Sequence, residues 1–329
     1  MSGETSITTL NPVNQTYIFA HPNPGCLRIA GPDQRAFIQR QTTNDVDLLK
    51  PNRAVLTVLT SPAARILDVF YLIDTPGKPG AGPDEPGCIE ALSLPGRAGI
   101  TARYLKGRIF FMDKVTLEDA SHEYQQLDLF GPGADSLLER LEIPVPPQVD
   151  EVVVANVSGA SLRILGLNPQ VGLGYRLVVP SDQYDTTLAA MAALGAQAIE
   201  PEDYEILRIE AGLPIAGREL TEDYTPLEVG LTGAISDRKG CYTGQEVIAR
   251  QVTYDKVTRR LAGLRLEAGV RPGESVQAEG RAVGVITSAA ISPRHGPVAL
   301  AVLKRPHHEP GASVTVGDGV SAQVSSLPF

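Results

Sequence analysis

Cysteine is scarce in this sequence, and its three cysteines, Cys26, Cys88 and Cys241, lie far apart. No C-x-x-C pair occurs, so the sequence supports neither a disulfide framework nor a zinc ribbon. Reduced thiols of this kind are typical of a cytoplasmic protein, and we expect this chain to be cytoplasmic. The five histidines show no spacing that suits a metal ion, so we expect no metal site.

Long apolar runs are absent as well. No stretch of 18 or more apolar residues occurs, so we expect no membrane-spanning helix. Residues 1–12 lack the basic-then-apolar pattern of a signal peptide. The formal net charge of −9 argues against a general nucleic-acid binder, which would normally be basic. The sequence therefore predicts neither a membrane nor a nucleic acid as a direct partner.

The residues that are present predict a folded protein of more than one domain. Hydrophobic residues make up 43% of the 329 positions, which is enough to bury a substantial core. Mixed helix and strand patterns predict an α+β region over residues 1–257, with subdomains of roughly 1–118 and 119–257. A run rich in proline and glycine at 75–87 predicts a loop. Short strands separated by turns predict a small β-barrel over residues 258–329.

The most informative stretch is 239–246, which reads Lys-Gly-Cys-Tyr-Thr-Gly-Gln-Glu. It places Cys241 shortly before a run that has a helical pattern, with Lys239 two positions earlier. The positive end of a helix and a nearby ammonium group both stabilise a thiolate, which is the reactive form of cysteine. We therefore predict a reactive thiol at Cys241. The alternative from local chemistry alone is a small cysteine packed in a turn.

The same stretch resembles the K-G-C-Y-x-G-Q-E signature of the YgfZ family, folate-binding relatives of the glycine cleavage T-protein (aminomethyltransferase). Other parts of the chain also resemble this family, so that the resemblance covers nearly the whole chain: 31–47, 207–217, 283–293 and 327–329. It implies two interleaved α+β folate-binding domains followed by a small C-terminal β-barrel. It also implies that tetrahydrofolate or another folate derivative binds in a central hole.

A folate site needs an apolar slot for the pterin, a carboxylate for the pterin edge and cations for the glutamate tail. Asp68, in an apolar strand pattern, resembles the T-protein aspartate that assists attack by the folate nitrogen. T-proteins have two adjacent aspartates there and this chain has one, and the alternative is an aspartate on the outward face of an edge strand. The resemblance places Arg208 in the folate cavity. The alternative is a surface arginine paired with Glu205 or Glu202.

We also predict folate contacts at Tyr175, at Tyr242 and at Lys239, a cation for the glutamate tail. The sequence also departs from T-proteins. Their R-T-G-Y-T-G-E-x-G-F-E segment, whose first glutamate recognises the pterin, has no clear counterpart here. Arg176 stands about where the last glutamate of that segment would be. T-proteins also lack the cysteine of the 239–246 stretch.

These features favour a YgfZ-like protein that binds folate and supports the maturation or repair of iron–sulfur enzymes, including those that thiomethylate tRNA. Cys241 and Asp68 are the candidate catalytic residues, and iron–sulfur enzymes are the expected protein partners. No cluster is implied in this chain, because a cluster normally needs about four cysteine ligands. Two alternatives stay open. One is a folate-dependent aminomethyltransferase or one-carbon demethylase of the T-protein type, and the other is a scaffold without a ligand.

Overall fold

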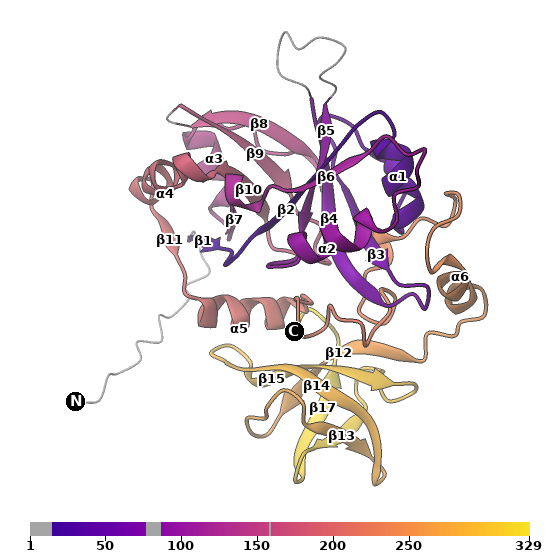
Figure 1. Cartoon of the computed structure of the whole chain (residues 1–329). Coiled ribbons are helices and arrows are strands. Elements are labelled where there is room, and N and C mark those ends of the chain that lie inside the picture. The colour runs from indigo at the N-terminus through magenta and orange to yellow at the C-terminus, as the bar shows by residue number, and fades with distance from the viewer. Residues whose placement is uncertain (1–14, 77–86, 158) are drawn as a thin grey trace.

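The computed structural model describes residues 15–76, 87–157 and 159–329. Two sheets with covering helices are followed by a closed β-barrel (Figure 1). The predicted α+β fold with a C-terminal barrel is therefore confirmed. Most of the loop predicted at 75–87 and the first 14 residues lie outside the described residues. No described helix is both long and apolar enough to cross a membrane.

One sheet has five antiparallel strands in the order β3-β4-β5-β2-β6. Its strands are β2 (Gly25–Ala30), β3 (Val55–Thr60), β4 (Ile66–Thr75), β5 (Cys88–Ser93) and β6 (Thr116–Asp119). Helices α1 (Gln34–Gln41) and α2 (Ala98–Lys106) supply apolar side chains to the core on one face. Both faces of β4 are buried, because Phe70 packs in that core while Val69 and Tyr71 pack in the core on the opposite face.

The other sheet has six strands in the order β11-β1-β7-β10-β9-β8. Its strands are β1 (Thr16–Ala20), β7 (Tyr124–Phe130), β8 (Val152–Val157), β9 (Ala160–Gly166), β10 (Tyr175–Pro180) and β11 (Ala196–Ala198). Helices α3 (Ala134–Arg140) and α4 (Tyr184–Ala193) contribute to its apolar core. β1 precedes the five-stranded sheet in the chain, yet it pairs with β7 and β11. The two α+β units therefore interleave.

Helix α5 (Pro201–Ala211) lies between the two sheets and the barrel in Figure 1. Proline occupies its first turn, where no backbone N–H is needed, and Gly212 ends it in a left-handed conformation with φ of 77°. Ile209 packs against the barrel residues Val298 and Leu300. The backbone N–H of Phe329 donates to the carbonyl of Glu210 at 2.9 Å, so the last residue is held against this helix.

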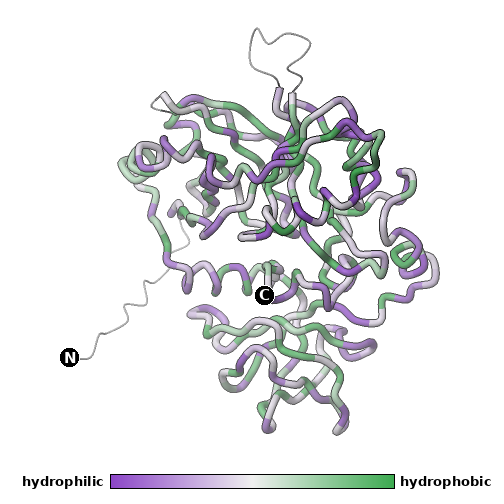
Figure 2. The backbone as a smooth tube through the Cα atoms, in the orientation of Figure 1, coloured by the Kyte–Doolittle hydropathy of each residue, from purple (hydrophilic) through white to green (hydrophobic). Residues whose placement is uncertain are grey.

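The barrel closes in the order β12-β15-β14-β13-β16-β17. Its strands are β12 (Arg259–Leu266), β13 (Ser275–Ala278), β14 (Arg281–Ser292), β15 (Gly296–Lys304), β16 (Ser313–Val316) and β17 (Val320–Ser325). Helix α6 (Gln245–Thr253) precedes it, and four short 3-10 turns are η1 (Val46–Leu48), η2 (Ser121–Glu123), η3 (Ser181–Gln183) and η4 (Thr232–Ala234). Figure 2 shows hydrophobic stretches along the strands of the two sheets and alternation along the barrel strands.

Candidate functional site

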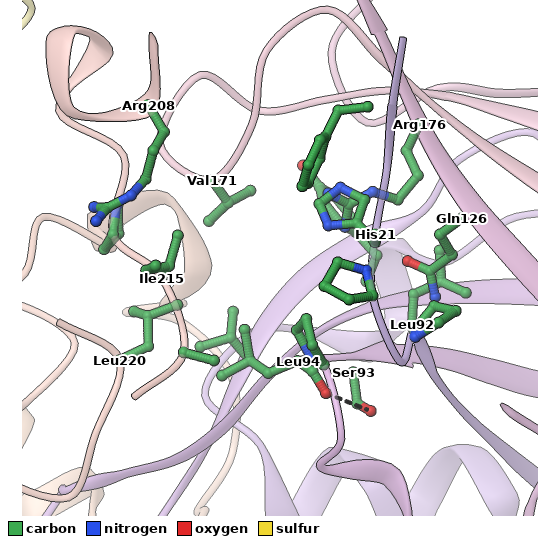
Figure 3. Close-up of a pocket in the computed structure, with 18 of the residues that line it drawn as sticks. His21, Leu92, Ser93, Leu94, Gln126, Val171, Arg176, Arg208, Ile215 and Leu220 are labelled. Carbon is green, nitrogen blue, oxygen red and sulfur yellow. Dashed lines mark hydrogen bonds between the residues drawn. The ribbon is translucent and has the colours of Figure 1, made fainter. Parts of the chain in front are cut away.

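A cavity of about 390 Å³ lies where the two sheets meet α5 and the loop that follows it. Val69 and Tyr71 of β4 line it from one sheet, and Gln126 of β7 and Arg176 of β10 line it from the other. In Figure 3, Arg208, Ile215 and Leu220 lie on one side of this cavity, and His21, Gln126 and Arg176 lie on the opposite side. Most of the wall is apolar, so the cavity suits a flat organic ligand with a few polar groups.

A polar cluster stands at one end of the cavity. Asp128 is fully buried behind the wall and accepts hydrogen bonds from Arg176 through Nε at 2.8 Å and Nη2 at 3.0 Å. Its Oδ2 also lies 2.8 Å from Nε2 of His21 and accepts the Tyr204 hydroxyl at 3.1 Å. The Tyr204 ring stacks on Phe19 with centroids 3.8 Å apart. These contacts fix the three wall residues around one carboxylate.

The electrostatics of this cluster favour an ionised Asp128. Burial alone would raise the pKa of Asp128, but the Arg176 guanidinium and the His21 ring outweigh burial and hold that pKa well below its usual range. Burial and the neighbouring Asp128 charge raise the pKa of the Tyr204 hydroxyl well above its ordinary value. The cluster therefore holds an anion whose charge Arg176 compensates, with a neutral tyrosine beside it.

Arg208 also lies in the cavity wall, but its guanidinium is already engaged. It pairs with Glu205, donates to the carbonyl of Leu213 at 3.1 Å and to the hydroxyl of Ser288 at 2.6 Å, and lies 3.5 Å from Glu219. Its side chain has no exposed surface, so the alternative of a surface arginine is wrong, although the pairing with Glu205 is present. A guanidinium with two protein carboxylates has little capacity left for a ligand carboxylate.

Asp68, which is expected to meet the ligand, is not among the residues that line the cavity. It is fully buried and accepts the backbone N–H groups of Val69 at 2.8 Å and Leu94 at 3.1 Å. Its other oxygen accepts the hydroxyl of Thr101 on α2 at 2.5 Å. Burial raises its pKa to about 6 in spite of these hydrogen bonds. Strand side chains alternate, so the next residue, Val69, faces the cavity instead.

Because of the same alternation, Tyr175 lies outside the cavity wall. Arg176 lines the cavity, and Tyr175, its neighbour on β10, donates its hydroxyl to Asp135 of α3 at 2.6 Å. The expected contact between Tyr175 and a ligand in this cavity is therefore not supported. Arg176 is the cavity residue of this pair.

Lys239 and Tyr242 are structural residues of the 239–246 stretch rather than residues of the cavity wall. The ammonium of Lys239 donates to the carbonyls of Gln39, Thr42 and Asn44, each at 2.7 Å. It also lies 5.3 Å from the centroid of the Tyr242 ring, and burial lowers the pKa of Lys239 to about 8. Tyr242 is buried in a small core with Ala64 and Ile248. Neither residue lines the cavity, and their binding of the ligand stays a prediction.

Cys241 is exposed and lies outside the wall of this cavity. It precedes α6, which begins at Gln245, so the predicted junction of loop and helix is present. The neighbouring ammonium of Lys239 is held by backbone carbonyls and is not available for the thiol. Cys26 is buried, which raises its pKa to about 12, and burial also raises the pKa of the half-buried Cys88. Cys241 is thus the accessible thiol of the three.

Little in the sequence indicates the polar end of the cavity, and four of its residues were not predicted: His21, Gln126, Asp128 and Tyr204. Asp128 interrupts an apolar strand, which is the same signal that singled out Asp68. The other three carry no local signal. Among residues 15–76, 87–157 and 159–329, no cluster of His, Cys, Asp and Glu side chains could hold a metal ion.

Comparison with known protein families gives two matches along the chain. The GCVT N-terminal domain matches residues 97–239, and the glycine cleavage T-protein C-terminal barrel domain matches residues 259–329. The second match coincides with the closed barrel of six strands. Both matches point to the same group of proteins.

Individual relatives extend the similarity over nearly the whole chain. The aminomethyltransferase of Thermus thermophilus is 30% identical over 318 residues, which cover 95% of this chain and 86% of that protein. A putative chloroplastic transferase of Arabidopsis thaliana is 30% identical over 316 residues, covering 93% and 69% of the two chains. The crystal structure of glycine cleavage system aminomethyltransferase T from Bartonella henselae shares the fold, with a TM-score of 0.80, 21% identity and coverage of 97% and 87%.

Proposed function

The chain belongs to the glycine cleavage T-protein (aminomethyltransferase) family, and from this premise we propose that it binds a folate in the central cavity and has the function of the YgfZ proteins. In that role it supports the maturation or repair of iron–sulfur enzymes, including those that thiomethylate tRNA. Cys241 supplies the working thiol. The protein partners are iron–sulfur enzymes, which hold the clusters themselves.

The shape and chemistry of the cavity support a folate. Tyr71, Leu92 and Val171 supply apolar surface of the kind that a flat pterin ring needs. The polar cluster around Asp128 stands at one end, where it can meet the hydrogen-bonding edge of such a ring. The volume of about 390 Å³ falls within the range of sites for small organic ligands.

One observation favours the YgfZ-like function over aminomethyl transfer: Val69, not Asp68, faces the cavity. Among the described residues that line the cavity, Glu205 supplies the carboxylate, and it is paired with Arg208. Removal of a proton from a folate nitrogen needs a basic group within hydrogen-bonding reach. A valine at this position and a paired glutamate do not provide a free carboxylate base.

The exposure of Cys241 supports a role for it outside the cavity. A thiol on the surface can be reached by a folded protein partner, whereas Cys26 is buried and Cys88 is half-buried. The loop that carries Cys241 is anchored on both sides by Lys239 and Gly244, so the thiol is presented from a defined position.

Two assays on the purified protein test this proposal together. Titration calorimetry with tetrahydrofolate should detect binding, and incubation with tetrahydrofolate and an aminomethyl donor should give no one-carbon transfer. In cells that lack their own YgfZ-type protein, the wild type and Cys88→Ala should restore the activity of iron–sulfur enzymes, and Cys241→Ala should not. Full rescue by Cys241→Ala would show that the thiol is dispensable.

A second candidate function is folate-dependent aminomethyl transfer or one-carbon demethylation. The similarity to the Thermus thermophilus aminomethyltransferase over 95% of this chain favours it. Catalytic turnover in the transfer assay would establish this function and would reject the YgfZ-like one.

A further inference from the structure

An apolar turn between α2 and β6, formed by residues 110–112, is exposed to solvent. The exposed fraction is 65% for Phe110, 98% for Phe111 and 72% for Met112. Single exposed apolar residues are ordinary on a protein surface, whereas several large ones side by side mark a site of interaction. No described part of the chain covers these three side chains. The turn therefore offers apolar surface to a partner outside the protein.

The turn is held in a fixed conformation by Asp113. The backbone N–H of Asp113 donates to the carbonyl of Phe110 at 2.9 Å, and its Oδ2 accepts the backbone N–H of Phe110 at 3.0 Å. Arg40 of α1 donates through Nη2 to both oxygens of this carboxylate, at 2.8 and 2.9 Å. The backbone N–H of Lys114 donates to Asp33 at 2.8 Å. Little conformational entropy is therefore lost when the turn docks.

Cations flank the turn on both sides. The segment 97–114 contains five basic residues and one acidic residue, Asp113, in a chain whose net charge is −9. Among the residues that the structure describes, no carboxylate pairs with three exposed cations of this segment: Arg103, Lys106 and Lys114. The one carboxylate is already paired with Arg40. An anionic surface is therefore the electrostatic complement of the turn.

The shape of the turn favours a lipid surface over a socket in another protein. A stable protein interface buries about 800 Å² on each partner, which three side chains on a convex turn do not supply. A bilayer requires less contact area. Apolar side chains enter the boundary between headgroups and acyl chains, and each nearby Lys or Arg adds attraction to anionic lipids without a fixed geometry.

We propose that the turn 110–112 inserts into the surface of an anionic bilayer, while Arg103, Lys106 and Lys114 contact the lipid headgroups. The contact is peripheral and reversible, and it does not rest on the proposed folate function. It departs from the expectation that no membrane is a direct partner. That expectation follows from the overall charge and from the lack of a spanning segment, and neither of these reports a local patch of cations around an apolar turn.

Co-sedimentation with vesicles tests the contribution of the apolar side chains. The vesicles contain roughly one part phosphatidylserine to two parts phosphatidylcholine, and vesicles of phosphatidylcholine alone are the comparison. The wild type should bind the anionic vesicles more tightly. Phe111→Ser should bind them about tenfold or more weakly, because it removes a large apolar side chain from the lipid. The matched control is Tyr254→Ser, which removes an aromatic side chain that is 66% exposed elsewhere and should bind like the wild type.

The same assay tests the cations. Lys106→Glu should weaken binding to the anionic vesicles by about fivefold or more, since each basic residue near the surface adds to the attraction. Arg281→Glu makes the same change of charge at an exposed position of the barrel and should have a much smaller effect. Thermal melting establishes that each variant is folded.

Fluorescence then locates the contact. The sequence contains no tryptophan, so Phe111→Trp and Tyr254→Trp each carry a single reporter. On anionic vesicles the emission from position 111 should shift to shorter wavelength, and the emission from position 254 should not.

Three results would overturn the proposal. No binding of the wild type to the anionic vesicles would make a protein the alternative partner of the turn. Full binding by Phe111→Ser, or unshifted emission from Phe111→Trp on vesicles that it binds, would show that another surface meets the lipid. Sedimentation velocity without lipid tests a second copy of the chain as the partner. A dimer that Phe111→Ser abolishes would assign the turn to self-association instead.

Discussion

At the scale of single residues, the alternation of side chains along strands decides which of two neighbours meets the cavity. Val69 and Arg176 line it, while Asp68 and Tyr175 point to other partners. The sequence did not reveal this choice, because both faces of β4 are buried and the strand lacks a polar face. Residue type and the family resemblance therefore favoured Asp68 and Tyr175, which have functional groups, over the residues that line the site.

Replacing Asp68 by asparagine should change how stability depends on pH. The folded pKa of about 6 lies above the ordinary value of 3.8, so the folded state binds this proton more tightly than the unfolded state. The contribution of Asp68 to the free energy of unfolding is fully present below about pH 4. It falls by roughly 3 kcal/mol as the pH rises through about 6. The free energy of unfolding from urea titrations should therefore fall over this range in the wild type, relative to Asp68→Asn.

The comparison between the two proteins cancels the contributions of other titrating groups. A constant difference between their unfolding free energies from pH 4 to pH 7 would contradict the assignment of a raised pKa to Asp68.

Cys241 should be the first thiol to react with an alkylating agent in the native protein. It is exposed, whereas burial keeps Cys26 and Cys88 protonated and shielded. Mass spectrometry after short exposure to iodoacetamide at neutral pH should find the label at Cys241, and Cys241→Ala should lose the fast phase. Equal labelling of the three thiols in folded protein would refute this prediction.

Arg208 should contribute more to the stability of the protein than to the binding of a charged group of the ligand. Arg208→Ala would leave Glu219 fully buried beside Ser288 without its cation, which should cost about 3–5 kcal/mol in the free energy of unfolding. The matched control is Arg305→Ala, which breaks an exposed pair with Asp255 and should change that free energy little. Chemical denaturation measures the free energy of unfolding of both variants. Similarly small losses in the two would show that the contacts of Arg208 do not stabilise the fold.

At the scale of elements, the 239–246 stretch is held by close packing against the turn between β3 and β4. The hydroxyl of Thr60 donates to the carbonyl of Thr243 at 2.6 Å. Gly244 has φ of 85°, and a Cβ placed there would lie 2.7 Å from the carbonyl oxygen of Ser61. The helix predicted after this glycine is α6, so the pattern located the element correctly. What it could not show is that most of the motif serves packing.

Gly244→Ala should therefore destabilise the protein, whereas Gly240→Ala should not. The left-handed conformation alone costs about 1–2 kcal/mol for alanine, and the contact with Ser61 adds to this. Gly240 lies in the same loop and has open space where a Cβ would stand. Urea denaturation of both variants gives the comparison. Equal stability of the two variants would mean that the loop adjusts freely and does not fix the position of Cys241.

At the scale of the whole molecule, local patterns were sufficient for the architecture but not for the site. Alternation, turn residues and family resemblance together predicted two α+β units and a barrel, and the structure confirms them. The cavity is built from β1, β4, β7, β10 and α5, which are far apart in the chain. Only their packing brings His21, Gln126 and Arg208 around one cavity. Partners at such sequence separations leave no local signal, so these residues could not be recognised together.

If this cavity is the folate site, a side chain that fills it should abolish folate binding, which calorimetry can measure. Val171→Trp should fill the cavity, and Val154→Trp places the same ring at an exposed position of β8 as a control. The account predicts that tetrahydrofolate binds the wild type and Val154→Trp at one site with similar affinity, and that Val171→Trp, although folded, shows no binding up to about 1 mM ligand. Unchanged binding by Val171→Trp, or no binding by the wild type, would contradict it.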